Sequence, residues 1–384
     1  MKVIIVGGGI LGTSHAWAAV QRGHRVIHLE REIQARGATV RNFGLVWVSG
    51  RSSAELATAQ FARDLWEKLG TDVPEIGFRP CGSLTLIRTP AELQVAEAAL
   101  AQPDSLERGF TLAEPDEVRR LNPALRGSFL AGLHCSRDGA VESRVALPAL
   151  RAHLAATGRY TFVSGHEART VTSSSSGIQV TDDHGLTHHG DNLIHCPGAT
   201  HGGLTRELIG GDFPVRRVRL QMMQTAPLGE SLTTAIADAD SMRYYPAFAG
   251  AALDTLTRNQ PQAEIASAQH MQLLCVQRLH GGLTIGDTHE YDRGSVDDEP
   301  AAFGFDVTED PYSYLAKTVS DFLGRALPPV IRRWAGVYSQ CLDPAQIVYR
   351  HQVSPGVWVI TGPGGRGMTL GPALAEQTAN LMAL

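Results

Sequence analysis

Residues 1–30 have the sequence MKVIIVGGGILGTSHAWAAVQRGHRVIHLE, and the pattern in this segment carries the fold assignment. The apolar run Lys2–Val6 is rich in β-branched residues and predicts a buried parallel strand. Ile10–Gln21 predicts an alanine-rich helix, and Arg25–Glu30 predicts a second strand. The chain therefore opens with a βαβ unit, which predicts a doubly wound α/β fold.

A glycine motif joins the first predicted strand to the helix. Gly7, Gly9 and Gly12 form the pattern GxGxxG. Glycines at these positions permit a tight turn, let a pyrophosphate lie against the backbone and place its charge at the helix N-terminus. Glu30 ends the second strand 18 residues after Gly12, where a carboxylate can accept hydrogen bonds from ribose hydroxyls. The segment predicts a dinucleotide site; a tight turn without a ligand is the alternative.

A second glycine cluster lies near the C-terminus, in TGPGGRGMTLGP, residues 361–372. It follows a predicted strand, Val357–Thr361, and precedes a predicted helix, Pro372–Leu384. Such a cluster exposes backbone N–H groups to an anion or to a ring edge at a helix start. A glycine-rich helix cap is the alternative, and these patterns alone leave both NAD and FAD open.

Composition excludes several classes of protein. The chain has 384 residues, enough for two or three domains with substantial cores. With 43 % hydrophobic and 19 % charged residues, it has no compositional sign of disorder. The formal net charge of −5 disfavours nucleic acid and anionic lipid as partners. No apolar stretch reaches the roughly 18 residues of a membrane span, so no membrane partner is expected.

The cysteines and the N-terminal segment bear on the compartment. MKVIIVGGG lacks the longer apolar region and small-residue cleavage site of a signal peptide. The cysteines stand singly and form no CxxC pair; they are Cys81, Cys135, Cys196, Cys275 and Cys341. We therefore expect a reduced, cytoplasmic protein. Ligand-type side chains alternate from Asp287 to Tyr291, but no second His or Cys cluster completes a shell, so no metal is expected.

Five motifs occur in one order along nearly the whole chain. They are residues 1–30, RNFG (41–44), LIHCPGAT (193–200), HGGLTIGDT (280–288) and VWVITGPGGRGMTLGPALAE (357–376). Together they resemble the FAD-dependent amine and amino-acid oxidase superfamily, of the D-amino-acid oxidase, glycine oxidase and sarcosine oxidase type. LTIGDTHEYD (283–292) and RRWAGVYS (332–339) also resemble a subgroup proposed to act in aminophosphonate breakdown.

The resemblance implies FAD as the cofactor, with the glycine motif, Glu30, a loop around residues 41–44 and the segment 364–369 around it. The expected FAD-binding residues are Gly7, Gly9, Ile10, Gly12, Glu30, Arg31, Arg41, Asn42, Phe43, Gly44, Gly198, Gly364, Gly365, Arg366, Gly367, Met368 and Thr369. Parallel-type segments lie at both ends and in the middle of the chain. We therefore expect an FAD-binding Rossmann-type domain (1–77, 143–213 and 335–384) interleaved with an antiparallel-sheet α+β substrate domain (78–142 and 214–334).

The chain departs from those families at three positions. Gly336, two residues before Tyr338, stands where sarcosine oxidase has the cysteine that tethers FAD, so we expect non-covalent FAD. Thr284 replaces the lysine that activates oxygen there, which leaves the electron acceptor open: O2 or another molecule. Tyr338 stands where glycine oxidase and D-amino-acid oxidase place the carboxylate-binding arginine. Another arginine then binds the substrate anion, or the substrate is not a simple α-amino carboxylate.

Arginines in the intervening segments are candidates for binding the substrate anion. Arg243 with Tyr244 and Tyr245 suits a substrate lid, and Arg278 precedes a predicted strand on the flavin side. The segment 216–219 adds three more arginines, and for any single one a solvated charge is the alternative. A phosphonate has three acceptor oxygens and favours several such donors. A helix predicted over 254–268 follows the lid segment.

These features lead to one favoured function and several rivals. We expect FAD-dependent oxidation of the C–N bond of a small amine bearing an anionic group, with phosphonate favoured. The imine product would hydrolyse to an aldehyde, and His289 and Tyr338 are the expected catalytic-site side chains. The alternatives are a glycine, sarcosine or D-amino-acid oxidase, a flavin dehydrogenase of 2-hydroxy acids with His289 as base, an NAD enzyme and a non-catalytic flavoprotein. The oligomeric state stays open.

Overall fold

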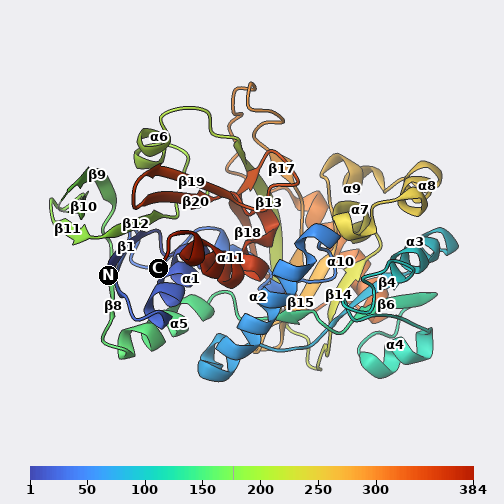
Figure 1. Cartoon of the computed structure of the whole chain (residues 1–384). Helices are drawn as coiled ribbons and strands as arrows, with labels where there is room; N and C mark the ends of the chain where they lie inside the picture. Colours follow the sequence, from blue (N-terminus) through green and yellow to red (C-terminus); the bar gives the residue numbers. More distant parts are fainter. Residues whose placement is uncertain (176) are drawn as a thin grey trace.

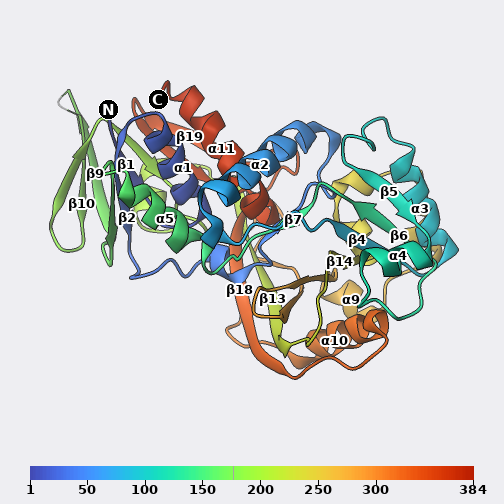
Figure 2. The ribbon, with the colours of Figure 1, turned by 90° about the horizontal axis from the view of Figure 1, so that it is seen from below.

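The computed structural model describes residues 1–175 and 177–384, which form two lobes (Figures 1 and 2). The first lobe is built on a six-stranded sheet in the order β19-β20-β12-β1-β2-β8. Its strands are β1 (Lys2–Val6), β2 (Arg25–Glu30), β8 (Tyr160–Ser164), β12 (Asn192–His195), β19 (Tyr349–Ser354) and β20 (Val357–Thr361). All neighbours pair in parallel except β19 with β20. The predicted doubly wound sheet is confirmed, including the βαβ opening.

Both faces of this sheet are covered because its strands are apolar on both sides. Val3 and Ile5 of β1 lie in the core beneath the helices, whereas Ile4 faces the opposite core. The helices on the first face are α1 (Ile10–Gln21), α2 (Ser53–Asp72), α5 (Ala146–Ala156) and α11 (Gly367–Leu381). A three-stranded sheet of β9 (Ala168–Ser174), β10 (Gly177–Asp182) and β11 (Thr187–Gly190) covers the other. The sequence SSSSG (173–177) predicts a hairpin tip, and it includes residue 176, which lies outside the described residues.

The second lobe contains a nine-stranded sheet in the order β17-β13-β16-β15-β14-β4-β6-β5, with β18 paired to β13. Its strands are β4 (Ser83–Ile87), β5 (Phe110–Ala113), β6 (Ala131–Cys135), β13 (Val215–Pro227), β14 (Ala235–Asp238), β15 (Leu274–Gln277), β16 (Gly282–Gly286), β17 (Glu290–Tyr291) and β18 (Val330–Cys341). The pairs are antiparallel except β4 with β14. Because β18 pairs with β13 along its length, the domain boundary expected at residue 335 falls inside a strand.

Helices and short strands complete the two lobes. The helices are α3 (Pro90–Leu100), α4 (Pro115–Leu121), α6 (Leu204–Ile209), α7 (Asp240–Tyr244), α8 (Ala251–Asn259), α9 (Glu264–Ala268) and α10 (Glu309–Leu323). The short strands β3 (Leu45–Val46) and β7 (Gly139–Ala140) pair with each other. None of the helices in the described part of the chain combines the length and apolar composition that a membrane crossing requires.

Two helix predictions are wrong in their bounds. The helix expected over 254–268 is two helices, α8 and α9, because Pro261 disfavours helical backbone at the residue before it. The terminal helix begins at Gly367 and so contains Pro372 in its interior. Proline leaves the carbonyl of Met368 without its helical partner, but the indole Nε1 of Trp66 donates to that oxygen over 3.0 Å. A tertiary hydrogen bond therefore permits the earlier start.

Candidate active site

A continuous cavity of about 1670 Å³ runs between the two lobes. Its wall includes the loop after β1 at one end and the glycine segment before α11. Residues of β13, β18 and the segment around α7 line the part toward the second sheet. The two glycine clusters, more than 350 residues apart in sequence, therefore face one cavity.

The loop after β1 has the geometry that only glycine allows. Gly7 has φ +107°, and a Cβ there would lie 2.1 Å from the carbonyl oxygen of Cys196. A Cβ on Gly12 would lie 1.9 Å from the carbonyl oxygen of Gly7. The Glu30 carboxylate lines the cavity and accepts hydrogen bonds from the Gly8 and Glu32 backbone N–H groups, at 2.6 and 3.0 Å. This end fits a pyrophosphate and an adjoining ribose.

The segment 364–369 has a different role at the other glycine cluster. A short 3₁₀ turn (Gly364–Arg366) leads into α11, whose N-terminus opens on the cavity. A Cβ on Gly365 would meet only the hydroxyls of Tyr338 and Tyr244, at 3.8 and 3.9 Å. The backbone is therefore accessible between two tyrosines, as a planar ring system needs. Thr369 fixes the helix start by accepting a 2.9 Å hydrogen bond from the Trp47 N–H.

Of the residues expected to bind FAD, all except Gly44 line the cavity. Gly44 has φ +71°, and a Cβ there would lie 2.2 Å from the Val141 carbonyl oxygen, so its glycine serves the loop itself. Asn42 also shapes that loop, because its Oδ1 accepts a 2.6 Å hydrogen bond from the Gly44 N–H. The described residues thus fit the FAD that the family resemblance implies. Neither Cys341 nor Thr284 lines the cavity, whereas Gly336 does.

Aromatic rings crowd the part of the cavity next to Gly365. The Tyr244 ring stacks on His289 with centroids 4.4 Å apart and contacts Tyr245 edge-on at 5.1 Å. The hydroxyls of Tyr244 and Tyr338 lie 3.4 Å apart. Burial raises the pKa of both phenols, so they stay neutral donors. The structure thus brings together four of the six side chains expected at the substrate end: His289, Tyr338, Tyr244 and Tyr245.

Arg51 is the basic residue that sequence reasoning missed. It follows the loop 41–50 and precedes α2, is 4 % exposed and lines the cavity. Its guanidinium lies 5.4 Å from the centroid of the Tyr245 ring. Its Nε has no hydrogen-bond partner among residues 1–175 and 177–384, and Glu55, the nearby acid, pairs with Arg366 instead. Burial lowers the pKa of Arg51, although Tyr245 and Glu55 act in the opposite direction, so its charge favours a further anion nearby.

The two expected anion-binding arginines are already engaged. Arg243 lines the cavity, but its three guanidinium nitrogens bond to Asp240 Oδ1, Thr257 Oγ1 and the Gln260 carbonyl oxygen. These bonds tie α7 to the end of α8. The guanidinium therefore secures α7 against α8, and its charge is already paired with the Asp240 carboxylate at 3.0 Å.

Arg278 does not line the cavity. Its guanidinium donates to the carbonyl oxygens of Val141, at 3.0 Å, and Phe43. It supports the loop 41–44 from behind, and this position does not favour the expected contact with substrate. Arg219 likewise does not line the cavity and pairs with Glu290 at 3.0 Å, whereas Arg216 lies in the wall.

A buried acid lies beside the aromatic rings. Asp287 lines the cavity, is 3 % exposed, and its Oδ1 has no hydrogen-bond partner in the described part of the chain. Burial raises its pKa to about 8. His289 Nε2 lies 4.0 Å from its Oδ2, and burial lowers the pKa of His289 to about 4. Gln272 completes this wall, and no pattern in the sequence distinguishes it from an ordinary strand residue.

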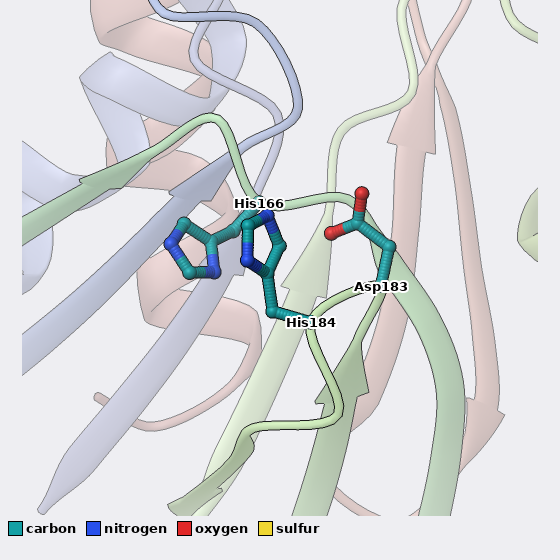
Figure 3. A group of neighbouring side chains, drawn as sticks. All are labelled: His166, Asp183 and His184. Carbon is teal, nitrogen blue, oxygen red and sulfur yellow. The ribbon is translucent and has the colours of Figure 1, made fainter.

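A separate group of potential metal ligands lies at the far end of the cavity, beside β9 and β10. Figure 3 shows His166, Asp183 and His184, whose ligand atoms lie within 4.8 Å of one another. The imidazole rings stack with centroids 4.3 Å apart, so their in-plane lone pairs do not converge on one ion. His166 Nδ1 bonds to Asp182 at 2.7 Å, and Asp183 accepts from the Glu167 N–H at 2.8 Å. The expected absence of a metal stays a prediction.

These features define a flavoenzyme, and comparison with known families agrees. The chain belongs to the family of FAD dependent oxidoreductases designated DAO, whose family model matches residues 2–381. FAD is therefore its cofactor, and the chain is an oxidoreductase.

Individual relatives are distant but span the chain. It is 21 % identical over 390 residues to a component of opine oxidase from Rhizobium meliloti, covering 97 % of this chain and 91 % of that protein. Glycine oxidase from Geobacillus kaustophilus superposes with a TM-score of 0.76 at 19 % identity, covering 100 % of this chain and 95 % of that one. L-proline dehydrogenase from P. horikoshii gives 0.78 at 18 % identity, covering 99 % and 92 %. These structures share the fold.

Replacing Glu30 by alanine is expected to weaken FAD binding by roughly 10 to 100 fold. The change removes charge-assisted hydrogen bonds worth about 1.5–3 kcal/mol, and it also frees the Gly8 and Glu32 N–H groups. FAD released into the supernatant by heat, per mole of protein, measures occupancy. Flavin retained in the pellet of the unmutated protein would instead indicate a covalent bond. A lower melting temperature with unchanged FAD content would make Glu30 purely structural.

Proposed function

We propose that this chain oxidises the C–N bond of a small amine bearing an anionic group, with FAD held non-covalently. The observation that carries the proposal is the buried Arg51 guanidinium, unpartnered at Nε among the described residues, in the cavity that also contains the glycine segment 364–369. A buried cation that has no acid hydrogen-bonded to it is costly, and an anionic substrate lowers that cost.

The side chains divide the work of binding. Bound FAD supplies the hydride acceptor. Arg51 would hold the anion through the planar set of N–H donors of its guanidinium. Tyr244 and Tyr338 would pack on either side of the reacting carbon beside Gly365 and exclude water from it. The product would be an imine that hydrolyses to an aldehyde, with electrons passing to O2.

Phosphonate is favoured over carboxylate as the anion. The wall offers Arg51, Arg216 and several phenol hydroxyls, and three phosphonate oxygens can use more of these donors than two carboxylate oxygens. Tyr338 in place of a carboxylate-binding arginine agrees with this preference. The names of the relatives, glycine oxidase, opine oxidase and iminodiacetate oxidase, support an amine substrate and keep a carboxylate as the second candidate.

Anaerobic bleaching of the bound flavin tests this proposal. The panel contains 2-aminoethylphosphonate, its N-methyl derivative, glycine, sarcosine, a D-amino acid and a 2-hydroxy acid. We expect one of the two aminophosphonates to bleach the flavin fastest. Faster bleaching by glycine, sarcosine or the D-amino acid would overturn the phosphonate preference. Bleaching by the 2-hydroxy acid alone would overturn the amine assignment and assign a base role to His289.

A further inference from the structure

We propose that Asp287 receives the proton that the substrate ammonium must lose before its C–N bond is oxidised. This role rests on the proposed amine oxidation. Asp287 directly follows β16, and its side chain is buried against the cavity wall. Its Oδ1 is one of the few buried polar atoms left without a hydrogen bond in the described residues, which indicates a ligand group at this position.

The groups around Asp287 explain why a ligand cation belongs there. From the other elements, the phenols of Tyr244, Tyr245, Tyr291 and Tyr338 face it, and burial raises the pKa of all four, so they remain neutral. His289, from its own segment, is also neutral because burial lowers its pKa to about 4.

Two arginines of the cavity wall lie over tyrosine rings near this carboxyl. Arg51 lies over the Tyr245 ring at 5.4 Å, and Arg216 lies over the Tyr291 ring at 4.1 Å. Neither pairs with Asp287 in the described part of the chain. The cavity thus holds cations and an acid that do not pair with each other, beside the same group of aromatic rings. A small dipolar ligand, anion at one end and ammonium at the other, matches this arrangement.

The proton transfer is balanced and changes no oxidation state. An N–H bond of the ammonium breaks, an O–H bond forms on the Asp287 carboxylate, and the electron pair stays on nitrogen. The neutral nitrogen then has the free electron pair that oxidation of its C–N bond requires. A protonated nitrogen has no such pair, so the proton must leave first.

The pH dependence follows from the carboxyl's environment. Burial raises the pKa of Asp287 to about 8. Below that pH the acid is protonated and cannot accept a proton, so kcat/KM should rise as the pH increases toward about 8. We call this rise the basic limb of the pH profile. At about pH 10, the ordinary range of amine pKa values, neutral amine enters directly and needs the acid less.

The test compares Asp287→Asn with Asp238→Asn in the FAD-loaded protein. Asp238 is a buried acid outside the cavity, its pKa is also raised by burial, and its Oδ1 accepts from the Ser241 and Leu273 N–H groups. We expect Asp287→Asn to lower kcat/KM for the best amine about 100-fold at pH 8 and to remove the basic limb. Near pH 10, kcat/KM of Asp287→Asn should be only about threefold below that of the unmutated protein. Asp238→Asn should keep the basic limb.

Each result decides the proposal. An unchanged basic limb in Asp287→Asn, or its loss in Asp238→Asn, overturns the role of Asp287 while amine oxidation stands. Absence of flavin bleaching by every amine overturns the proposed function and this role with it. If Asp287→Asn fails to hold FAD, Asp287→Glu and the unmutated protein decide: a basic limb that shifts between the two supports the role, and a profile flat through pH 8 in the unmutated protein overturns it.

Discussion

Replacing Arg51 by methionine is expected to raise KM for the preferred anionic amine about 100-fold, because two charge-assisted hydrogen bonds to the anion are lost. Methionine keeps an apolar chain of similar length against Tyr245, so the fold and FAD content should be retained. KM for an uncharged amine of the same length should change by less than about threefold. Steady-state kinetics with both amines provides the measurement.

The matched control is Arg243→Met. Both arginines line the cavity, but Arg243 already bonds to Asp240, Thr257 and Gln260. Its replacement should lower the melting temperature and leave KM for the anionic amine within about threefold of the original. A larger KM effect from Arg243→Met than from Arg51→Met would show that Arg243, and not Arg51, binds the anion. Equal losses for charged and uncharged amines would show that Arg51 shapes the cavity and does not bind the anion.

The sequence predicted the cofactor half of the site because its signals are local. A glycine that must turn, a strand and a carboxylate at a fixed spacing all lie within residues 1–30, and their roles need no knowledge of distant segments. Gly44 was the exception. Its special backbone conformation could be expected, but the Val141 carbonyl that fills the space beside it lies 97 residues later in the chain.

The substrate half depends on long-range packing. Arg51 stands in Gly-Arg-Ser-Ser before a helix, a pattern equally typical of a solvated loop, and only burial beside Tyr245 makes its charge significant. Arg278 lies behind the loop 41–44 because it donates to the carbonyl oxygen of Val141, which is 137 residues away in the sequence. The start of α11 similarly depends on Trp66, 302 residues from Met368. Neither periodicity nor motif spacing reports such partners.

A steric constraint at Gly12 leads us to expect a large loss of FAD affinity when this residue gains a side chain. A Cβ there would lie 1.9 Å from the Gly7 carbonyl oxygen and 3.1 Å from His28 Nε2. The first contact is with backbone, which cannot move aside without opening the turn between β1 and α1. That turn sets the distance at which a pyrophosphate can meet the helix N-terminus.

Gly12→Ala is therefore expected to weaken FAD binding by roughly 100-fold or more, about 3 kcal/mol, and to yield largely colourless protein. Gly37→Ala is the matched control, because Gly37 also lines the cavity, has φ −77° and has no atom within 4 Å of an added Cβ. Its FAD content should be unchanged. Titration of FAD-free protein with FAD, followed by flavin fluorescence, compares the two. Full FAD affinity in Gly12→Ala would mean that the turn can open without cost, and that the glycine motif is not what positions the pyrophosphate.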